Sequence, residues 1–256
     1  MLVIRPEQME LFRRIARQPF EAEMLAHGKR FSPRLSEVLG DEQLRVALRR
    51  AIDRATGYGF TNRGPVRLYI ELMFLFGSGF DSDPQYRWAS EILRGDHEQM
   101  QRANELYEHV LDYQARVSGP DKANTRRALN ELLTFARSPA ELSSPDFADG
   151  MVDVMRRIFP EKASYVGEAD LRVLISEGNV IAGKLRFPAP RGAILIVALM
   201  FAFGHGCTDD PLYPWIARTL ADERITDPAA RAMRLEKKAI TWLDHVLHPS
   251  SRPLPA

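Results

Sequence analysis

The chain of 256 residues contains a single cysteine, Cys207. It can therefore form neither a disulfide within itself nor a zinc site with several thiolates, and this fits a reducing compartment. The first eight residues turn polar at once and lack the apolar stretch of a secretory signal. We therefore expect a cytoplasmic protein.

Long apolar runs are also missing. The longest, Ala193–Phe203, has eleven residues, whereas a membrane-spanning helix needs about 20. This run predicts a buried helix in a soluble protein, with no membrane as partner.

Charge of one sign is not in excess. The chain has 35 Lys and Arg against 34 Asp and Glu, and residues 1–118 hold 17 of each sign. Binding to nucleic acid usually requires clustered Lys and Arg, so we expect no nucleic-acid partner. Hydrophobic residues make up 45% of the chain, as in a globular protein.

The sequence lacks the common catalytic motifs. It has no G-x-S-x-G, no phosphate-binding Walker loop, no H-E-x-x-H and no dinucleotide-binding glycine pattern. His245 and His248 lie three residues apart and could share a metal, but no acidic or thiol partner accompanies them. We predict no metal, no cofactor, no small-molecule substrate and no enzymatic activity.

What the chain does contain is an internal repeat. Leu72–Trp88 matches Leu199–Trp215 at an offset of 127, and from Phe20 to Trp88 there are 21 identities in 69 positions. Unrelated sequences of ordinary composition would share roughly 4. Beyond Trp88 the second copy gains about nine residues, because His109 matches His245 at an offset of 136.

We therefore predict an all-α fold made by tandem duplication of a multi-helix unit of roughly 100 residues, with pseudo-symmetry. The first repeat covers residues 1–118. The second covers 119–256, with a lead-in helix at about 122–137 and a Pro-rich tail from Pro249.

The helices of the first repeat follow from apolar spacing and from capping residues. No run alternates well enough to predict a strand. The expected helices cover residues 6–17 and 20–31 with an interruption at Pro19, a helix capped by Asp41 and ending near Gly57, a central helix from Pro65 to Gly77, a helix capped by Asp83 and ending at Gly95, and residues 97–116.

The repeated motif F-G-x-G-x-x-x-D-P-x-Y-x-W is interpreted as a corner. One glycine ends a helix, the second permits the turn, Asp-Pro starts the next helix, and the aromatic residues fix the corner in the core. The motif residues are Phe76, Gly77, Gly79, Asp83, Pro84, Tyr86 and Trp88 in the first copy, and Phe203, Gly204, Gly206, Asp210, Pro211, Tyr213 and Trp215 in the second.

Three functional readings of this motif are weaker. A phosphate loop is disfavoured because Asp81 and Asp83 would repel the anion. A calcium loop that starts at Asp81 would need Gly at position 6 and Glu at position 12, where Tyr86 and Ile92 stand.

The third reading is a Cys–His nucleophile at Cys207, with His205 and Asp209 beside it. The first copy has Ser78, Phe80 and Ser82 at these positions, so the pair is not part of the shared framework. A thiol nucleophile also needs a positioned base and an orienting group, which this spacing does not supply.

The central helices of the two copies differ. Arg67 and Glu71 lie four residues apart and can pair on an exposed face, whereas their equivalents Ile194 and Ala198 leave the second helix apolar on every side. We treat these four residues as a candidate interface, with the second helix packed against the first copy or a partner.

Two stretches resemble a family. They are Ile4–Met9 with Phe20, Met24, His27 and Phe31, and Arg67–Gly77 leading into Asp83, Pro84 and Trp88. They resemble small helical proteins that bacteria encode beside the spike, PAAR-tip and effector genes of type VI secretion systems. The resemblance covers about residues 1–115 and, in the second copy, mainly the corner motif.

The resemblance implies a protein that binds another protein, a secreted effector or a toxin. The leading hypothesis is an effector chaperone or adaptor, and the first alternative is an immunity protein that neutralises a co-encoded toxin. An enzyme with an unrecognised site is the further alternative. Rescue of cells that produce the toxin domain would distinguish an immunity protein from a chaperone.

Overall fold

The computed structural model describes residues 6–138 and 146–248, with side chains from residue 18 onward. These residues form helices and short helical turns and no strand, which confirms the predicted all-α class. None of the described helices is both long enough and apolar enough to cross a membrane. The Pro-rich tail predicted from Pro249 lies outside the described residues.

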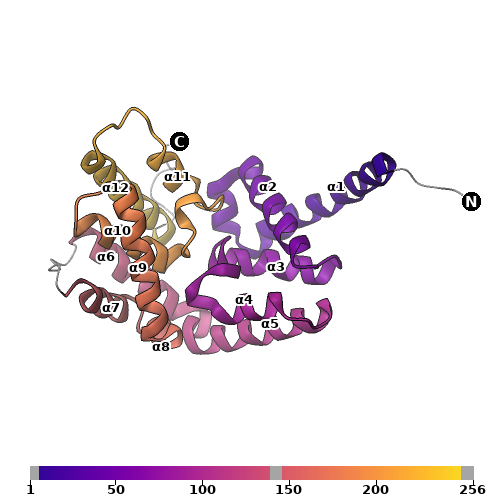
Figure 1. The fold of residues 1–256 in the computed structure, drawn as a ribbon, viewed down its shortest axis with the longest axis horizontal. Helices are drawn as coiled ribbons and strands as arrows, with labels where there is room; N and C mark the ends of the chain where they lie inside the picture. Colours follow the sequence, from indigo (N-terminus) through magenta and orange to yellow (C-terminus); the bar gives the residue numbers. More distant parts are fainter. Residues whose placement is uncertain (1–5, 139–145, 249–256) are drawn as a thin grey trace, which may run out of the picture.

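The first half of the chain contributes five α-helices, which lie together on the right in Figure 1. They are α1 (Pro6–Phe31), α2 (Pro33–Gly57), α3 (Arg63–Phe76), α4 (Arg87–Arg94) and α5 (Gln99–Tyr113). Two 3-10 turns, η1 (Phe80–Ser82) and η2 (Pro84–Tyr86), connect α3 to α4.

The second half contributes seven α-helices and lies on the left in Figure 1. The short π-helix η3 (Gln114–Ser118) and the 3-10 turn η4 (Pro120–Lys122) lead into it. Its helices are α6 (Ala123–Arg137), α7 (Phe147–Ile158), α8 (Pro160–Val166), α9 (Glu168–Lys184), α10 (Arg191–Phe203), α11 (Pro214–Leu220) and α12 (Pro228–Leu247), with the 3-10 turn η5 (Cys207–Asp209) before α11.

Several helix boundaries in the second half fall 127 residues after boundaries in the first. Pro160 begins α8 as Pro33 begins α2, Lys184 ends α9 as Gly57 ends α2, and Phe203 ends α10 as Phe76 ends α3. Two of these three matched boundaries carry the same residue type in both halves, and the third pairs Gly57 with Lys184.

One local prediction is wrong. Pro19 does not interrupt a helix, because α1 continues through it from Pro6 to Phe31. Proline removes one backbone hydrogen bond, and the buried Met24 and Leu25, on the part of α1 that packs on α2, hold the helix despite this loss.

The helix predicted from Asp41 does begin there, because Gly40, with a φ of 70° and a ψ of 166°, is not helical and divides α2 into two helical segments. Gly167, with a φ of 82°, precedes α9 in the same way. The Asp41 carboxylate pairs with Lys29 at 2.6 Å. The predicted ends of α3 at Gly77 and of α4 at Gly95 are confirmed.

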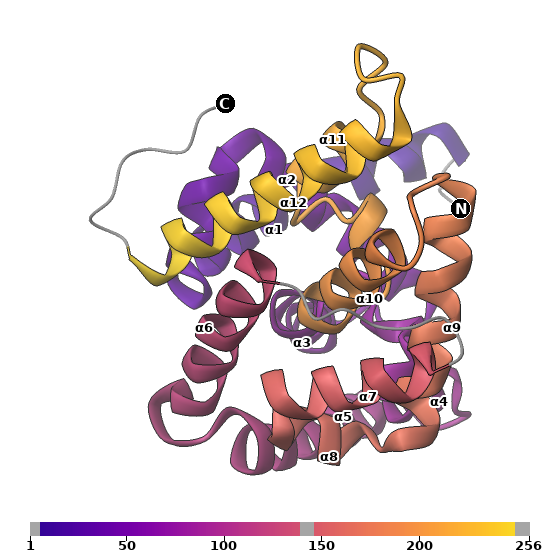
Figure 2. The same ribbon diagram turned by 90° about the vertical axis from the view of Figure 1, so that its left-hand side faces the viewer.

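The buried apolar residues form one continuous cluster with members from both halves. In the second half, α10 lies at the centre with α7, α9 and α12 around it (Figure 2). Ten of its thirteen residues are buried, as the apolar run predicts. The ends of α3 and α10 meet near the middle of the molecule, and this meeting point positions the site described next.

Candidate functional site at the junction of the two halves

The two corner motifs pack against each other backbone to backbone. Gly77 and Gly204 end α3 and α10 with φ of 93° and 95°. A Cβ atom on Gly77 would lie 2.5 Å from the carbonyl oxygen of Phe203, and one on Gly204 would lie 2.7 Å from that of Phe76. Both the backbone angle and the close approach therefore require glycine at each position.

The two motif aspartates cross this junction in opposite directions. The Asp83 Oδ2 atom accepts a hydrogen bond of 2.7 Å from the His205 amide, and the Asp210 Oδ2 atom accepts one of 2.7 Å from the Ser78 amide. Each carboxylate also caps the turn that follows it. Asp83 accepts a hydrogen bond of 2.9 Å from the Gln85 amide, and Asp210 accepts one of 2.8 Å from the Leu212 amide. Each aspartate thus joins the halves and shapes its own corner.

These carboxylates are almost completely buried. Burial raises the pKa of Asp83, although the charge of His205 and the amide hydrogen bonds oppose this rise. Burial likewise raises the pKa of Asp210 against the amides of Leu212 and Ser78. The ionised form of each aspartate is therefore held at the junction at a cost in free energy.

The motif aromatics pack in the same way in both halves. Phe76 lies 4.4 Å from Tyr86 and edge-on to Trp88 at 5.9 Å, while Phe203 lies 4.6 Å from Tyr213 and edge-on to Trp215 at 6.3 Å, between ring centroids. The other predicted motif residues lie in the same corners: Pro84 opens η2, Pro211 follows Asp210, and Gly79 and Gly206 approach each other.

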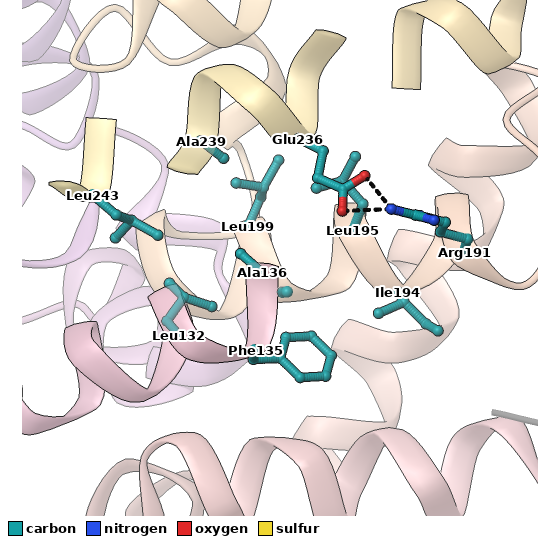
Figure 3. A pocket seen from close by; sticks show the side chains of 11 residues that line it. Leu132, Phe135, Ala136, Arg191, Ile194, Leu195, Leu199, Glu236, Ala239 and Leu243 are labelled. Atoms are coloured by element: carbon teal, nitrogen blue, oxygen red, sulfur yellow. Dashed lines mark hydrogen bonds and ion pairs between the residues drawn. The ribbon is translucent and has the colours of Figure 1, made fainter. Parts of the chain in front are cut away.

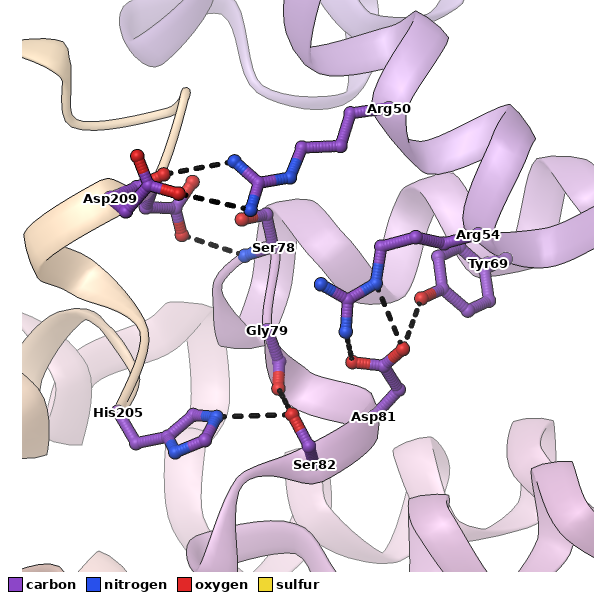
Figure 4. A network of polar contacts seen from close by, with 10 residues as sticks. Arg50, Arg54, Tyr69, Ser78, Gly79, Asp81, Ser82, His205 and Asp209 are labelled. Atoms are coloured by element: carbon purple, nitrogen blue, oxygen red, sulfur yellow. Dashed lines mark hydrogen bonds and ion pairs between the residues drawn. The ribbon is translucent and has the colours of Figure 1, made fainter. Parts of the chain in front are cut away.

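Polar side chains add contacts around the junction (Figure 4). Arg50 of α2 donates to the Asp209 carbonyl at 3.0 Å and to its carboxylate at 3.2 Å. The Ser82 Oγ atom lies 3.2 Å from Nε2 of His205. The Gln43 side chain donates to the Pro211 carbonyl at 3.0 Å. These contacts all connect one half to the other.

The first half also contains a buried ionic network (Figure 4). The Asp81 carboxylate has no exposed surface, pairs with Arg54 through two hydrogen bonds, and accepts one of 2.8 Å from the Tyr69 hydroxyl. Burial by itself lowers the pKa of Arg54, but the Asp81 carboxylate overrides this effect and raises it. Asp81, the residue on which the calcium reading depended, is thus held by an arginine.

Cys207 lies fully buried in η5. Burial raises the pKa of its thiol, and the negative charges of Asp210 and Asp83 raise it further. The ring of His205 is directed to Ser82 and to Glu177, whose Oε2 lies 3.4 Å from Nδ1. A reactive thiolate needs the opposite surroundings, an electropositive and partly exposed site.

The candidate interface residues lie in different surroundings. Arg67 is exposed and its Nε donates to Glu71 at 2.9 Å. Ile194 and Ala198 are buried and line an apolar hollow with residues of α6 and α12, which belong to the same half (Figure 3). At its edge, the guanidinium of Arg191 donates to both carboxylate oxygens of Glu236, at 2.8 and 2.9 Å.

A cavity of about 230 Å³ lies between the halves, beside the corner aromatics. Phe76, Tyr86, Phe203 and Tyr213 line it, together with Lys162 of α8. Lys162 is not among the residues that the sequence motifs single out. The available signal was its register, because the residue 127 positions earlier is the apolar Leu35.

A larger groove of about 950 Å³ opens on the surface beside α11 and α12, with Val38 and Leu39 of α2 on one side. Trp215 and Trp242 line it as aromatic residues. The charged lining residues are Arg218, Arg224, Arg234, Lys237 and Lys238, with Asp222 and Glu223 as the acids. Asp222 pairs with Arg224 at 2.8 Å.

The groove cations come from three separate segments, which explains why their clustering is not visible in the sequence. Arg218 lies in the last turn of α11, Arg224 lies in the following loop, and Arg234, Lys237 and Lys238 lie on α12. Among the described residues, no group of three or more His, Cys, Asp or Glu side chains is suited to hold a metal ion.

Comparison of the chain with protein-family models found no match, and neither did comparisons with curated proteins and with solved structures.

Proposed function

We propose that this protein is a non-catalytic protein-binding module that receives an acidic segment of a partner protein in the groove beside α11 and α12. In the cell it would act as an effector chaperone or adaptor of a bacterial type VI secretion system. The observation that carries the proposal is the charge and shape of this groove.

The groove has an excess of positive charge. Arg218, Arg234 and Lys237 form no ion pair with any residue of the described part of the chain, and all three are exposed. Cations held close together repel each other, and an anionic partner relieves this repulsion and is steered toward the site. The chain as a whole carries a net charge of only +1, so the groove is a local concentration of positive charge.

The groove also offers an apolar anchor. Two of its lining residues are tryptophans, of which Trp215 is half-buried and Trp242 is 8% exposed. Binding surfaces usually combine a central aromatic contact with a polar rim. The matching occupant is a protein segment that carries several Asp or Glu residues around one large apolar side chain.

We also propose that the two halves are copies of one ancestral unit, with residues 1–118 and 119–256 as the repeats. The support is the register of identities, the shared helix boundaries and the reciprocal aspartate hydrogen bonds. In this view the corners provide a rigid scaffold, and the groove, which residues of α2 and of α11 and α12 form together, provides the binding.

The test uses the effector encoded beside the gene, co-produced with the full-length protein. The triple variant Arg218→Glu, Arg234→Glu and Lys237→Glu should reduce effector level and complex recovery at least tenfold. The control variant Arg30→Glu, Arg126→Glu and Arg157→Glu changes the net charge equally at exposed positions outside the groove and should retain both.

Equal loss in both triple variants would contradict a specific groove. A fluorescent peptide with four Glu residues around one Leu should bind the wild type and weaken with added salt, and a single-stranded oligonucleotide that binds more tightly would indicate nucleic acid instead. Rescue of cells that produce only the toxin domain would replace the chaperone role by the immunity role.

A further inference from the structure

The cavity between the halves has features that a protein-binding scaffold does not need. Its volume of about 230 Å³ exceeds the roughly 150 Å³ of an engineered apolar cavity that binds benzene. Its walls are mainly aromatic and aliphatic, and both halves contribute to them. The cavity is therefore large enough for one ring or a short chain with a polar head group.

The charged residues that line the cavity all carry the same sign. Lys162 and Lys122 line it, and no Asp or Glu does. The Lys162 side chain is buried, with 4% exposure, whereas Lys122 is exposed. Lys122 therefore lies where the cavity reaches solvent, and Lys162 is the cation in its interior.

Lys162 is poorly satisfied within the described part of the protein. Its ammonium group can donate three hydrogen bonds. One goes to the Phe201 carbonyl at 2.5 Å. The nitrogen also lies 4.9 Å from the ring centroid of Phe201 and 5.5 Å from that of Tyr86, contacts that favour a cation only modestly.

No described carboxylate forms an ion pair with Lys162. Burial lowers its pKa to about 8, although the charge of Asp83 acts in the opposite direction. A buried cation without a paired anion is costly in free energy. An incoming anion would remove much of this cost.

The fold itself does not require a lysine here. In the register of the repeat, Lys162 corresponds to Leu35, at the same place after the proline that starts α2 and α8. The first half therefore builds the same helix with an apolar residue. The lysine is an addition specific to the half that lines the cavity.

We propose that this cavity binds a small monocarboxylic acid with an aromatic ring or a short aliphatic chain, and that the carboxylate pairs with Lys162. The ring or chain would contact Phe76, Phe203 and the neighbouring tyrosines. A carboxylate fits better than a phosphate, because a phosphate dianion usually needs several cations or a set of backbone amides around it, and only one buried cation is present.

The experiment measures binding of benzoate, phenylacetate and hexanoate by calorimetry and by thermal shift, with benzamide as the uncharged match for benzoate. We expect at least one acid to bind the wild type with a dissociation constant in the millimolar range or below. Its amide should bind at least tenfold more weakly.

Matched variants assign the site. Lys162→Met keeps most of the side-chain volume and should weaken acid binding at least tenfold, whereas Lys184→Met, at an exposed position outside the cavity, should leave it unchanged. Ala202→Leu reduces the cavity without altering charge and should also weaken binding. If Lys162→Met does not fold, Ala202→Leu still tests the location.

The pH dependence provides a second readout. A bound carboxylate favours the protonated lysine, so affinity should fall as pH rises through about 8 and binding near that pH should take up protons. Binding that is equal in wild type and Lys162→Met, or no binding of any of the three acids, would overturn the proposal and leave a cavity filled only by water. Neither result bears on the groove, which the charge-reversal variants test separately.

Discussion

The two halves of this protein share their corners and differ in what surrounds them. Near the junction, the first half buries an ionic network of Arg54, Asp81 and Tyr69. The register equivalents are Ile181, Thr208 and Ile196. The second half instead buries Lys162 beside a cavity and presents the basic groove. Shared residues thus build the junction, and residues that differ give each half its own chemistry.

The largest expected effect concerns the two glycines at the junction. Gly77→Ala and Gly204→Ala should each reduce the free energy of unfolding by about 4 kcal/mol, because the new Cβ would meet a backbone carbonyl and the backbone is in a left-handed region. Denaturation in guanidinium chloride measures this effect.

Gly167→Ala is the matched control for these glycine variants. Gly167 has a φ of 82°, but a Cβ there would meet nothing within 4 Å. It should cost only about 1 kcal/mol, from backbone strain alone. If all three variants lower the free energy of unfolding equally, then the backbone conformation, and not the close packing of the two corners, is what requires glycine at positions 77 and 204.

The next effect separates the halves. Asp81→Ala leaves the partly buried Arg54 without its carboxylate and should cost about 3 kcal/mol. The triple variant Arg54→Ile, Asp81→Thr and Tyr69→Ile installs the residues of the second half at the equivalent positions. It should recover most of this loss, since apolar packing can replace a buried ion pair. A triple variant no more stable than Asp81→Ala would show that the surroundings of these three positions in the first half do not accept the residues that the second half has there.

A smaller effect tests whether the crossing aspartates are equivalent. Each of these carboxylates accepts hydrogen bonds from two backbone amides, and Asp83→Asn or Asp210→Asn replaces one accepting oxygen by an amide nitrogen, which cannot accept. Each variant should therefore lower the free energy of unfolding by about 1–2 kcal/mol. The exposed Asp227 caps α12 only, and Asp227→Asn should cost well under 1 kcal/mol. Unequal effects at positions 83 and 210 would break the symmetry of the junction.

The same aspartates predict a pH dependence. Because burial raises the pKa of Asp83 and of Asp210 in the folded state, the folded protein binds more protons than the unfolded chain just above the unfolded pKa of about 4. Their contribution to stability is therefore greatest at low pH and falls as pH rises through this window. The two Asn variants should each flatten this slope, as thermal unfolding between pH 4 and 7 would measure.

Local sequence signals predicted many of the elements correctly. Gly77 and Gly95 end their helices and Asp83 caps the turn that follows it, because these effects act within a few residues. The interruption predicted at Pro19 is wrong for the opposite reason: the packing of α1 on α2 outweighs the local preference of this single residue.

The candidate site was predictable only in part. Both halves keep the two glycines and the one aspartate of the corner motif, and this was a signal that the corners do more than turn the chain, since other residues can also cap helices. The crossing bonds, the pairing of Asp81 with Arg54, and the gathering of Arg218, Arg234 and Lys237 all join residues from different elements, and their spacing in the chain does not reveal this.

The sequence by itself determined the helical class, the 127-residue register of identities between the two halves and the ends of several helices, because hydrophobic period, proline and glycine act over a few residues. Only the tertiary structure decided that the corners meet each other, that Lys162 faces a cavity and that the cations of α11 and α12 line one groove. These features depend on how helices pack, which brings together residues that are distant in the chain.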